Sequence, residues 1–191
     1  MSVWSCTLNS FCDQVASSAP VPSCGATACV CASLALALLQ MAIRKSYDQE
    51  QTDSELDLDI IKGQQLLTVM KAHADNDMRT FGAFIEDAGT GSSRHSRQHA
   101  LDITLGSLAA ARSCYEGIVL AQSAVSNVKR ALQCDVVSSA LMMHASLSAL
   151  LINVDMDAAN LPANSQTTEL MRARADLQSQ ADELLARLRG V

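Results

Sequence analysis

The sequence predicts an all-α protein, an antiparallel bundle of about six helices, and three observations support this fold class. Hydrophobic residues make up 49% of the 191 residues but aromatic residues only 3%, so the core must consist of Leu, Ala, Val, Ile and Met. With only 8 Gly and 3 Pro, the chain has few residues that interrupt helices. Long apolar or amphipathic segments alternate with short polar ones, which is typical of antiparallel helices. The length suits one domain with a sizeable core, residues 1–191.

Six segments are expected to form helices. Their approximate ranges are 4–16, 25–46, 54–87, 95–126, 134–154 and 165–189. The stretch SSAPVPS closes the first helix, and AGTGSS ends the third. Asp53 or Ser54 is the expected N-cap of the third helix, and Gly106 is a candidate kink in the fourth.

An uncharged run covers residues 25–43 and is long enough to cross a membrane. It is rich in small residues (GATACVCAS) and no aromatic belt flanks it, so a membrane span is disfavoured. Cys24, Cys29 and Cys31 lack a CxxC pair and a following His, which also disfavours a zinc site. We therefore expect a helix buried inside the protein.

Charge and cysteine usage argue against two further classes of protein. The formal net charge is −6 and the basic residues are scattered, whereas nucleic-acid binding needs clustered Lys and Arg. Seven cysteines, an odd number, fit thiols kept reduced better than a disulfide framework. The first residues, MSVWSCTLNSFCDQ, lack the basic region of a signal peptide. A cytoplasmic protein is expected.

The third predicted helix carries a carboxylate on its apolar face. The apolar residues of this face, spaced three and four apart, are Leu67, Met70, Ala74, Phe81 and Phe84. Asp77 lies on the same face between Ala74 and Phe81. A buried carboxylate is costly unless it is paired or functional, so both a structural hydrogen bond and a functional role stay open.

Other polar residues have ordinary explanations. His95 and His99 are four apart but lie near a loop, and we expect them to be exposed rather than to bind a metal. His144 lies on the apolar face of the fifth helix, where a hydrogen-bonded core histidine is the default and pocket lining the alternative. Arg44 and Lys45 end the second helix and complement its dipole.

Three blocks of the sequence match a known family in order and spacing. APVPSCGATAC precedes an Ala-rich helix that ends LLQMAIRKSY, DNDMRTF contains Asp77 and Phe81, and QCDVVSSALMMHASLSALLINVDMD contains Asp135 and Asn153-Val154. These blocks resemble the formiminotransferase–cyclodeaminase C-terminal family. The family reads Ala-Pro-x-Pro-Gly-Gly-Gly, Asp-x-x-Ala-Phe, and Ser-Asp-x-x-x-Ala followed by Asn-Val-x-x-Asn. It includes formiminotetrahydrofolate cyclodeaminases and methenyltetrahydrofolate cyclohydrolases.

The sequence departs from the family pattern at motif positions. Ser23 and Cys24 replace the first two glycines, and only Gly25 remains. Asp157 stands at the last Asn of the third block, and Gly106-Ser107-Leu108 stands where the family has Val-Pro-Leu. The Leu-Pro-Lys usual after the third helix is absent. The chain is identified as a divergent member.

The resemblance implies one-carbon chemistry on tetrahydrofolate, without a metal or a redox cofactor, in a homodimer. A cyclohydrolase adds water to the methenyl carbon between N5 and N10. A cyclodeaminase closes the ring as N10 attacks the formimino carbon and ammonia leaves. Both reactions need a positioned proton acceptor and donor, and Asp77 is the expected one.

The N-terminal turn of the second helix is expected to form a wall of the folate site. The expected substrate-binding residues are Ser23, Cys24, Gly25, Asp135, Asn153, His144 and Arg44, the last near the glutamate tail. Asp135 could equally be a helix N-cap. The alternative function is a binding or scaffold protein that kept the bundle and lost the activity, because Ser23 and Cys24 reshape or close the site.

Overall fold

The computed structural model describes residues 2–47, 54–90 and 93–190, and their side chains except at 54–55, 87–90 and 93–97. The described residues form helices joined by short loops and contain no strand. The elements are η1 (Val3–Ser5), α1 (Leu8–Val15), α2 (Cys24–Ser46), α3 (Ser54–Thr90), α4 (Ser93–Ala124), η2 (Arg130–Leu132), α5 (Gln133–Ala158) and α6 (Ser165–Leu188), where η marks a 3-10 helix. The predicted all-α fold class is confirmed.

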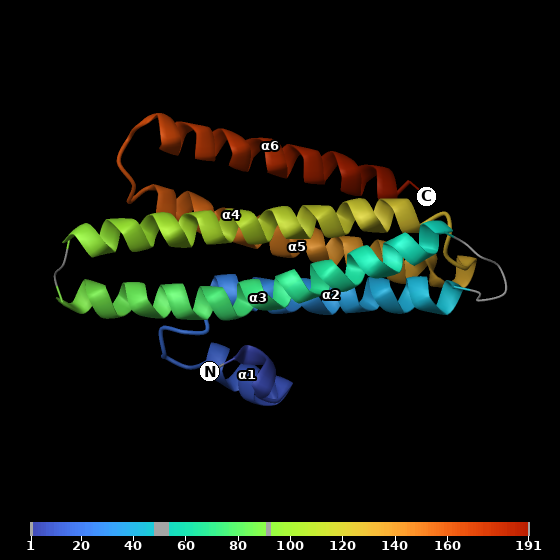
Figure 1. Ribbon diagram of the computed structural model, residues 1–191, viewed down its shortest axis with the longest axis horizontal. Helices are drawn as coiled ribbons and strands as arrows, with labels where there is room; N and C mark the ends of the chain where they lie inside the picture. Colours follow the sequence, from blue (N-terminus) through green and yellow to red (C-terminus); the bar gives the residue numbers. More distant parts are fainter. Residues whose placement is uncertain (1, 48–53, 91–92, 191) are drawn as a thin grey trace.

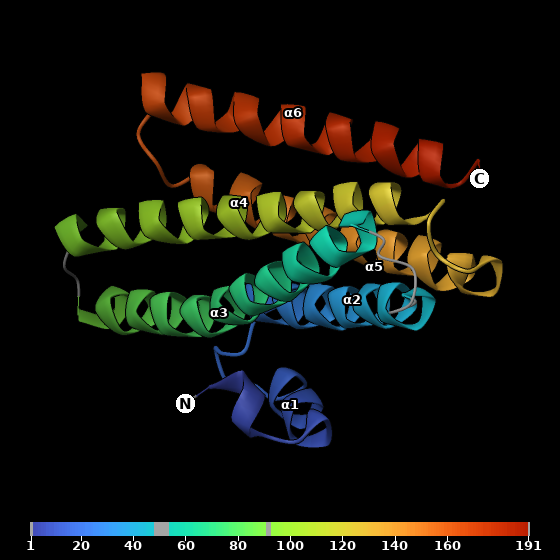
Figure 2. The same cartoon turned by 45° about the vertical axis from the view of Figure 1, so that its right-hand side comes forward.

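Four long helices, α2 to α5, lie side by side along the long axis of the molecule, and α6 packs on their outside (Figure 1). α2 contacts α3 and α5, α4 contacts α3 and α5, and α6 contacts α5 and α4. Consecutive long helices run in opposite directions, as expected for helices joined by short loops. The short helix α1 lies outside this bundle, next to α2 and α3 (Figure 2).

The first predicted helix, 4–16, is wrong in its extent, because local hydrogen bonds divide it. Ser2 accepts the N–H of Trp4 and starts the 3-10 turn η1. Thr7 is extended and its hydroxyl accepts the N–H of Ser10 at 3.1 Å, which makes Thr7 the N-cap of α1. A helix cannot continue through an extended residue, so two short elements replace one.

The N-terminal segment is attached to α3 by side-chain hydrogen bonds. The hydroxyl of Ser2 and the backbone N–H of Val3 donate to the two oxygens of Asp75 at 2.7 and 2.9 Å. The indole N–H of Trp4 donates to the carbonyl of Lys71, whose ammonium lies 5.4 Å from the indole ring centroid. These contacts place the N-terminus beside the middle of α3.

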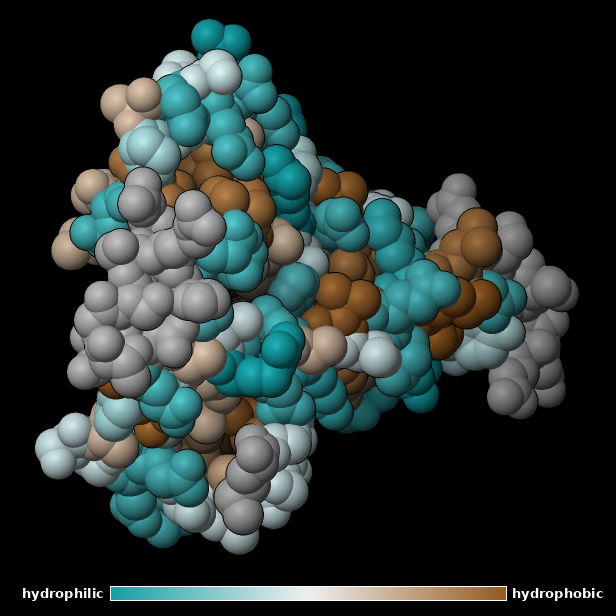
Figure 3. Space-filling view, turned by 60° about the vertical axis from the view of Figure 1, so that its left-hand side comes forward, coloured by the Kyte–Doolittle hydropathy of each residue, from teal (hydrophilic) through white to brown (hydrophobic). Residues whose placement is uncertain are grey.

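α2 packs inside the bundle as predicted. Leu36, Leu39 and Ile43 are fully buried. By length and composition both α2 and the segment Arg130–Ala158 could cross a membrane, but 67% of the most apolar stretch of α2 is buried within the protein. On the face that Figure 3 shows, apolar surface is exposed in patches between hydrophilic ridges.

The remaining helix boundaries agree with the sequence to within a few residues. α3 extends to Thr90 and α5 to Ala158, each three or four residues beyond the predicted end, and α4 continues through Gly106. Of the two predicted N-caps of α3, Asp53 lies outside the described residues, and Ser54 is the first residue of the helix rather than its cap. On the predicted apolar face of α3, Met70 and Ala74 are fully buried.

Candidate functional site

Asp77 of α3 lies against the first turn of α2. The backbone N–H of Ala26 donates to Asp77 Oδ2 at 2.8 Å. The other oxygen, Oδ1, lies so close to Gly25 that a Cβ added there would come within 2.0 Å of it. Glycine alone lacks a Cβ, so this contact requires Gly25. Gly25 is also the one glycine of the first family block that the sequence keeps.

Asp77 caps α2 in the way that a helix is usually capped by its own N-cap residue. Ser23 occupies the N-cap position, but its side chain makes no capping hydrogen bond. The carboxylate of Asp77 instead accepts a first-turn N–H and lies at the positive end of the helix dipole. The sequence predicted that this turn forms a wall of the folate site; the N–H of Ala26, however, is bonded to Asp77 and is not available to a ligand.

Burial dominates the electrostatics of this carboxyl group. It raises the pKa of Asp77 to about 6; the hydrogen bond from Ala26 acts in the opposite direction, and the nearby charge of Asp157 raises the pKa further. Burial also raises the pKa of Asp157. The thiol of Cys29 has its pKa raised to about 12 by burial and by Asp77. Near neutral pH, Asp77 can therefore exchange a proton while Cys29 stays protonated.

A small, nearly closed cavity lies beside Asp77, between α2, α3, α4 and α5. We call it the Asp77 cavity; its lining residues are Cys29, His73, Asn76, Asp77, Thr80, Ile103, Gly106, Ser107, Ala110 and Leu150. The centre of a water molecule has about 10 Å³ of room in it, which is about the space that one water needs. The cavity is too small for a pterin ring.

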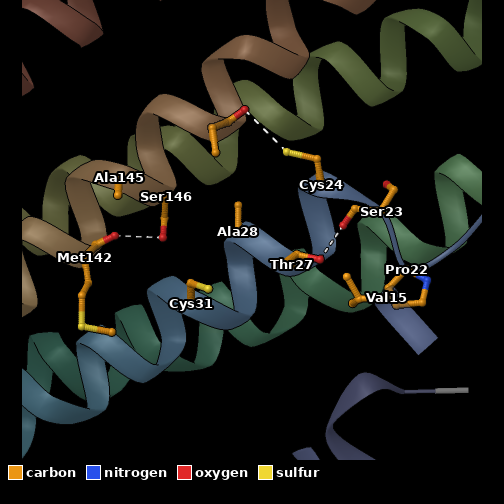
Figure 4. Close-up of a pocket in the computed structure, with 11 residues that line it drawn as sticks. Val15, Pro22, Ser23, Cys24, Thr27, Ala28, Cys31, Met142, Ala145 and Ser146 are labelled. Carbon is orange, nitrogen blue, oxygen red and sulfur yellow. Dashed lines mark hydrogen bonds between the residues drawn. The ribbon is translucent and has the colours of Figure 1, made fainter. Parts of the chain in front are cut away.

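Two larger grooves lie along the helices that line this cavity. The α2–α5 groove has a volume of about 580 Å³ and is lined by Val15, Pro22, Ser23, Cys24, Thr27, Ala28, Cys31, Met142, Ala145, Ser146 and Ala149 (Figure 4). The α3 groove has a volume of about 800 Å³ and is lined by Ser2, Val21, Ala72, Asp75, Asn76, Met78, Arg79, Gly82, Ala83 and Glu86. Both have the size of small-molecule sites. Asn76 lines both the α3 groove and the Asp77 cavity.

Ser23 and Cys24, the replacements of the family glycines, are not among the residues that line the Asp77 cavity. Both line the α2–α5 groove instead (Figure 4). The thiol of Cys24 lies 3.9 Å from the carbonyl oxygen of Ala149 on α5, within hydrogen-bond range for sulfur. Cys24 is nevertheless near Asp77, because burial and, to a smaller extent, the charge of Asp77 raise the pKa of its thiol.

Asp135 and Arg44 lie far from Asp77. Asp135 is in the first turn of α5, after the N-cap Leu132, so its alternative as an N-cap is wrong. It is about 27 Å from Asn153 along the same helix, at 1.5 Å per residue. Arg44 is in the last turn of α2 and donates to the side-chain oxygens of Gln40 and Gln64.

His144 forms a pair with α6 rather than with the other candidate residues. Its Nε2 lies 2.6 Å from Asp182 Oδ1, and this hydrogen bond holds the pKa of Asp182 below its usual range. The pair links α5 to α6. His99 is partly buried rather than exposed as expected, and the side chain of His95 lies outside the described residues.

Four polar residues of the Asp77 cavity are not among the site residues predicted from the sequence: His73, Asn76, Thr80 and Ser107. On α3, His73 and Thr80 are four and three residues from Asp77, so the helical repeat could have identified them, whereas Asn76 is its direct neighbour in the sequence. Burial lowers the pKa of His73, and its Nε2 lies 3.3 Å from the hydroxyl of Ser113. Ser107 comes from α4, and no local pattern places it opposite Asp77.

Among the side chains that the structure describes, no group of three His, Cys, Asp or Glu residues could hold a metal ion. The cavity offers proton-transfer groups instead: a carboxyl, an imidazole and two hydroxyls. These groups can act as acids, bases and hydrogen-bonding partners.

Comparisons with known proteins agree with this fold. The family model described as formiminotransferase-cyclodeaminase matches residues 7–176, and the chain belongs to that family. The crystal structure of formiminotetrahydrofolate cyclodeaminase from Thermotoga maritima is similar with a TM-score of 0.92, covering 98% of this chain and 96% of that one. The sequence identity is 17%, so this likeness shows the shared fold. A search of curated proteins gives no significant match.

Proposed function

We propose that the protein is an enzyme of tetrahydrofolate one-carbon metabolism, with Asp77 as the general acid and base. The observation that carries the proposal is the position of Asp77 at the start of α2. One carboxyl oxygen is fixed by the N–H of Ala26, and the other lies beside Gly25, where there is no side chain. The raised pKa of Asp77, about 6, suits a group that must both accept and donate a proton near neutral pH.

The reaction is either the hydrolysis of 5,10-methenyltetrahydrofolate or the cyclisation of 5-formiminotetrahydrofolate with loss of ammonia. In each, one proton must leave the attacking group and one must reach the departing nitrogen. A single carboxyl beside the reacting carbon can perform both transfers in turn. Neither reaction uses a metal or a redox cofactor.

The α3 groove is the proposed place of the folate. Its volume of about 800 Å³ suits a ligand of that size, and it adjoins the Asp77 cavity at Asn76, which lines both. Arg79 lies in the same groove and contacts a neutral partner, Asn76 Oδ1, at 2.6 Å. Its guanidinium charge can therefore meet a carboxylate of the glutamate tail.

A specific observation also supports the alternative, a helical scaffold without activity. Asp77 already has a structural role as the cap of α2, and a residue with such a role can persist after catalysis is lost. The cavity beside it admits about one water molecule and no substrate ring. The two functions differ in whether folate binds and turns over.

We also propose a cytoplasmic homodimer, formed through α2 and α5. On α5, side chains spaced three and four residues apart form an apolar row that remains accessible: Met142, Ala145, Ala149, Ile152 and Met156. Ile152 is 59% and Met156 69% exposed. Leu34 of α2, which borders the α2–α5 groove together with α5, is 47% exposed. Such a spacing suits packing against the helices of a second copy.

The decisive experiment is calorimetric titration of the purified protein with tetrahydrofolate and with 5,10-methenyltetrahydrofolate, followed by a turnover assay. Loss of the methenyl absorbance would report ring opening, and ammonia release from 5-formiminotetrahydrofolate would report deamination. Asp77→Asn is the matched control, because it keeps the size and the hydrogen-bond acceptor for Ala26. Binding without turnover in either assay would support the scaffold.

A further inference from the structure

Ser107 differs from the other buried hydroxyl residues of the bundle. The buried Ser and Thr residues of the described part of the chain are Ser33, Thr104, Ser107, Ser113, Ser139 and Ser146. Five of them donate to a backbone carbonyl about one turn earlier in their own helix, as hydroxyls in helices commonly do. Ser107 Oγ has no hydrogen-bond partner among the described residues, although the residue is only 4% exposed. A buried hydroxyl is costly unless a partner reaches it.

Space for such a partner lies next to Ser107. The residue lines the Asp77 cavity from α4, opposite His73, Asn76 and Thr80 of α3. A buried water needs room for its centre of about 10–15 Å³ and two to four polar neighbours. The Asp77 cavity offers about 10 Å³ and a polar lining, which matches a single water.

An acceptor lies on the other wall of this cavity. Asp77 Oδ2 is occupied by the N–H of Ala26, whereas Oδ1 accepts no hydrogen bond from the described residues. A water has two donors and two acceptor sites. It can donate to Asp77 Oδ1 and exchange a second hydrogen bond with Ser107 Oγ, which both donates and accepts.

We propose that the Asp77 cavity holds one ordered water between Asp77 Oδ1 and Ser107 Oγ, and that Ser107 thereby positions the water that hydrolyses 5,10-methenyltetrahydrofolate. The proposal rests on the proposed function and selects hydrolysis, because deamination consumes no water. Asn76 lines both the Asp77 cavity and the α3 groove, so the cavity that holds this water adjoins the groove proposed for the substrate. The family pattern has proline at the position of Ser107, and proline has no hydroxyl, so this group is a property of the present sequence.

The chemical step balances with these groups alone. The Asp77 carboxylate takes a proton from the water while the water oxygen bonds to the methenyl carbon, and the C=N π pair moves to the ring nitrogen. The neutral carbinolamine then loses its hydroxyl proton to solvent as the carbonyl forms. The C–N5 electron pair moves to N5, which takes the proton back from Asp77. The products are 10-formyltetrahydrofolate and one proton in solvent.

The first test is a crystal structure of the wild-type protein at a resolution that shows waters, together with Ser107→Val. Valine removes the hydroxyl and fills the space, so the water should be present in the wild type, about 3 Å from both atoms, and absent in the variant. Ser33→Ala is the matched control, because Ser33 is buried but bonded within its own helix. A wild-type structure in which Ser107 Oγ donates to the carbonyl of Ile103 and no water is present would overturn the proposal.

The second test measures the pKa of Asp77 by carboxyl carbon NMR. A water that donates to the carboxylate favours the charged form, so its loss in Ser107→Val should raise the pKa, and Ser33→Ala should leave it unchanged. If Ser107→Val does not fold, Ser107→Ala serves in its place. Hydrolysis should fall about 10–100-fold in kcat with KM nearly unchanged.

The two proposals fail differently. Hydrolysis by a wild-type protein without this water, or without the pKa shift in the variant, removes the role of Ser107 and leaves the proposed function in place. An ordered water in a wild-type protein that does not hydrolyse the methenyl substrate removes the proposed function, and with it the catalytic role of the water.

Discussion

Asp77 and Gly25 are in contact although fifty-two positions separate them in the sequence. A Cβ on residue 25 would lie only 2.0 Å from the carboxyl oxygen Oδ1 of Asp77. The hydrogen bond from Ala26 to Oδ2 fixes the same carboxyl from the other side. The first turn of α2 and the middle of α3 are thus joined by one side chain. The capping of α2, the position of the Asp77 carboxyl and the space beside Gly25 therefore depend on one another.

Gly25→Ala should therefore destabilise the protein. The added methyl group cannot coexist with Asp77 in its present position, so either the carboxyl or the helix turn must move. We expect a loss of about 1–3 kcal/mol in the free energy of unfolding. Urea denaturation measures this.

The matched control is Gly82→Ala in α3, where an added Cβ meets nothing within 4 Å. Alanine favours helix over glycine by roughly 0.5–1 kcal/mol, so this variant should be more stable than the wild type. Equal effects of the two substitutions would show that the contact between Gly25 and Asp77 does not constrain the fold.

Asp77 should also make stability depend on pH. Its folded-state pKa, about 6, lies above the ordinary value of 3.8, so the unfolded chain ionises first as the pH rises. Between about pH 4 and 6 the folded state binds more protons than the unfolded state. The free energy of unfolding therefore decreases as the pH rises through this range.

Asp77→Asn should reduce that dependence. The amide cannot ionise, yet its oxygen can still accept the N–H of Ala26. We expect the variant to exceed the wild type by about 1–3 kcal/mol at pH 8 and to lose about 10²–10⁴-fold in turnover. Denaturation curves at pH 4 and 8, with activity at pH 7, measure both quantities. A wild type whose stability rises from pH 4 to 6 while that of the variant stays level would mean that Asp77 is not destabilised by burial.

The sequence predicted the long helices and the position of Asp77 on the inner face of α3, because each depends on patterns within one helix. The spacing that placed Asp77 beside Ala74 on a buried face is a local property of α3. The cap of α2, in contrast, comes from Asp77, fifty-one positions after Ala26. The sequence alone suggests Ser23 instead, because serine is a common N-cap residue. Ser107 faces Asp77 only because α4 packs on α3. Such contacts depend on the relative rotation of helices, which no single segment encodes.

Ser23 and Cys24 are the departures that the sequence analysis expected to reshape or close the folate site. Because both line the α2–α5 groove, replacing them with glycine should leave the affinity for tetrahydrofolate within a few-fold of the wild type. The variant should lose stability, by roughly 0.5–1 kcal/mol per residue, since glycine loses more entropy on folding. Calorimetry measures the affinity for tetrahydrofolate, and urea denaturation measures the stability. A large gain in affinity would mean that these side chains occlude the ligand and that the α2–α5 groove is the folate site.

The homodimer is tested by placing a charge on the apolar row of α5. Ile152→Glu introduces a carboxylate at a position that is 59% exposed in the isolated chain and would be buried between two copies. The free chain should tolerate it, so the expected result is a shift from dimer to monomer in light scattering with little change in helical circular dichroism. Leu58→Glu is the control, because Leu58 is similarly exposed, at 66%, but lies on α3 away from this row. A wild type that is monomeric at micromolar concentration, or a dimer that Ile152→Glu leaves intact, would rule out α5 as the interface.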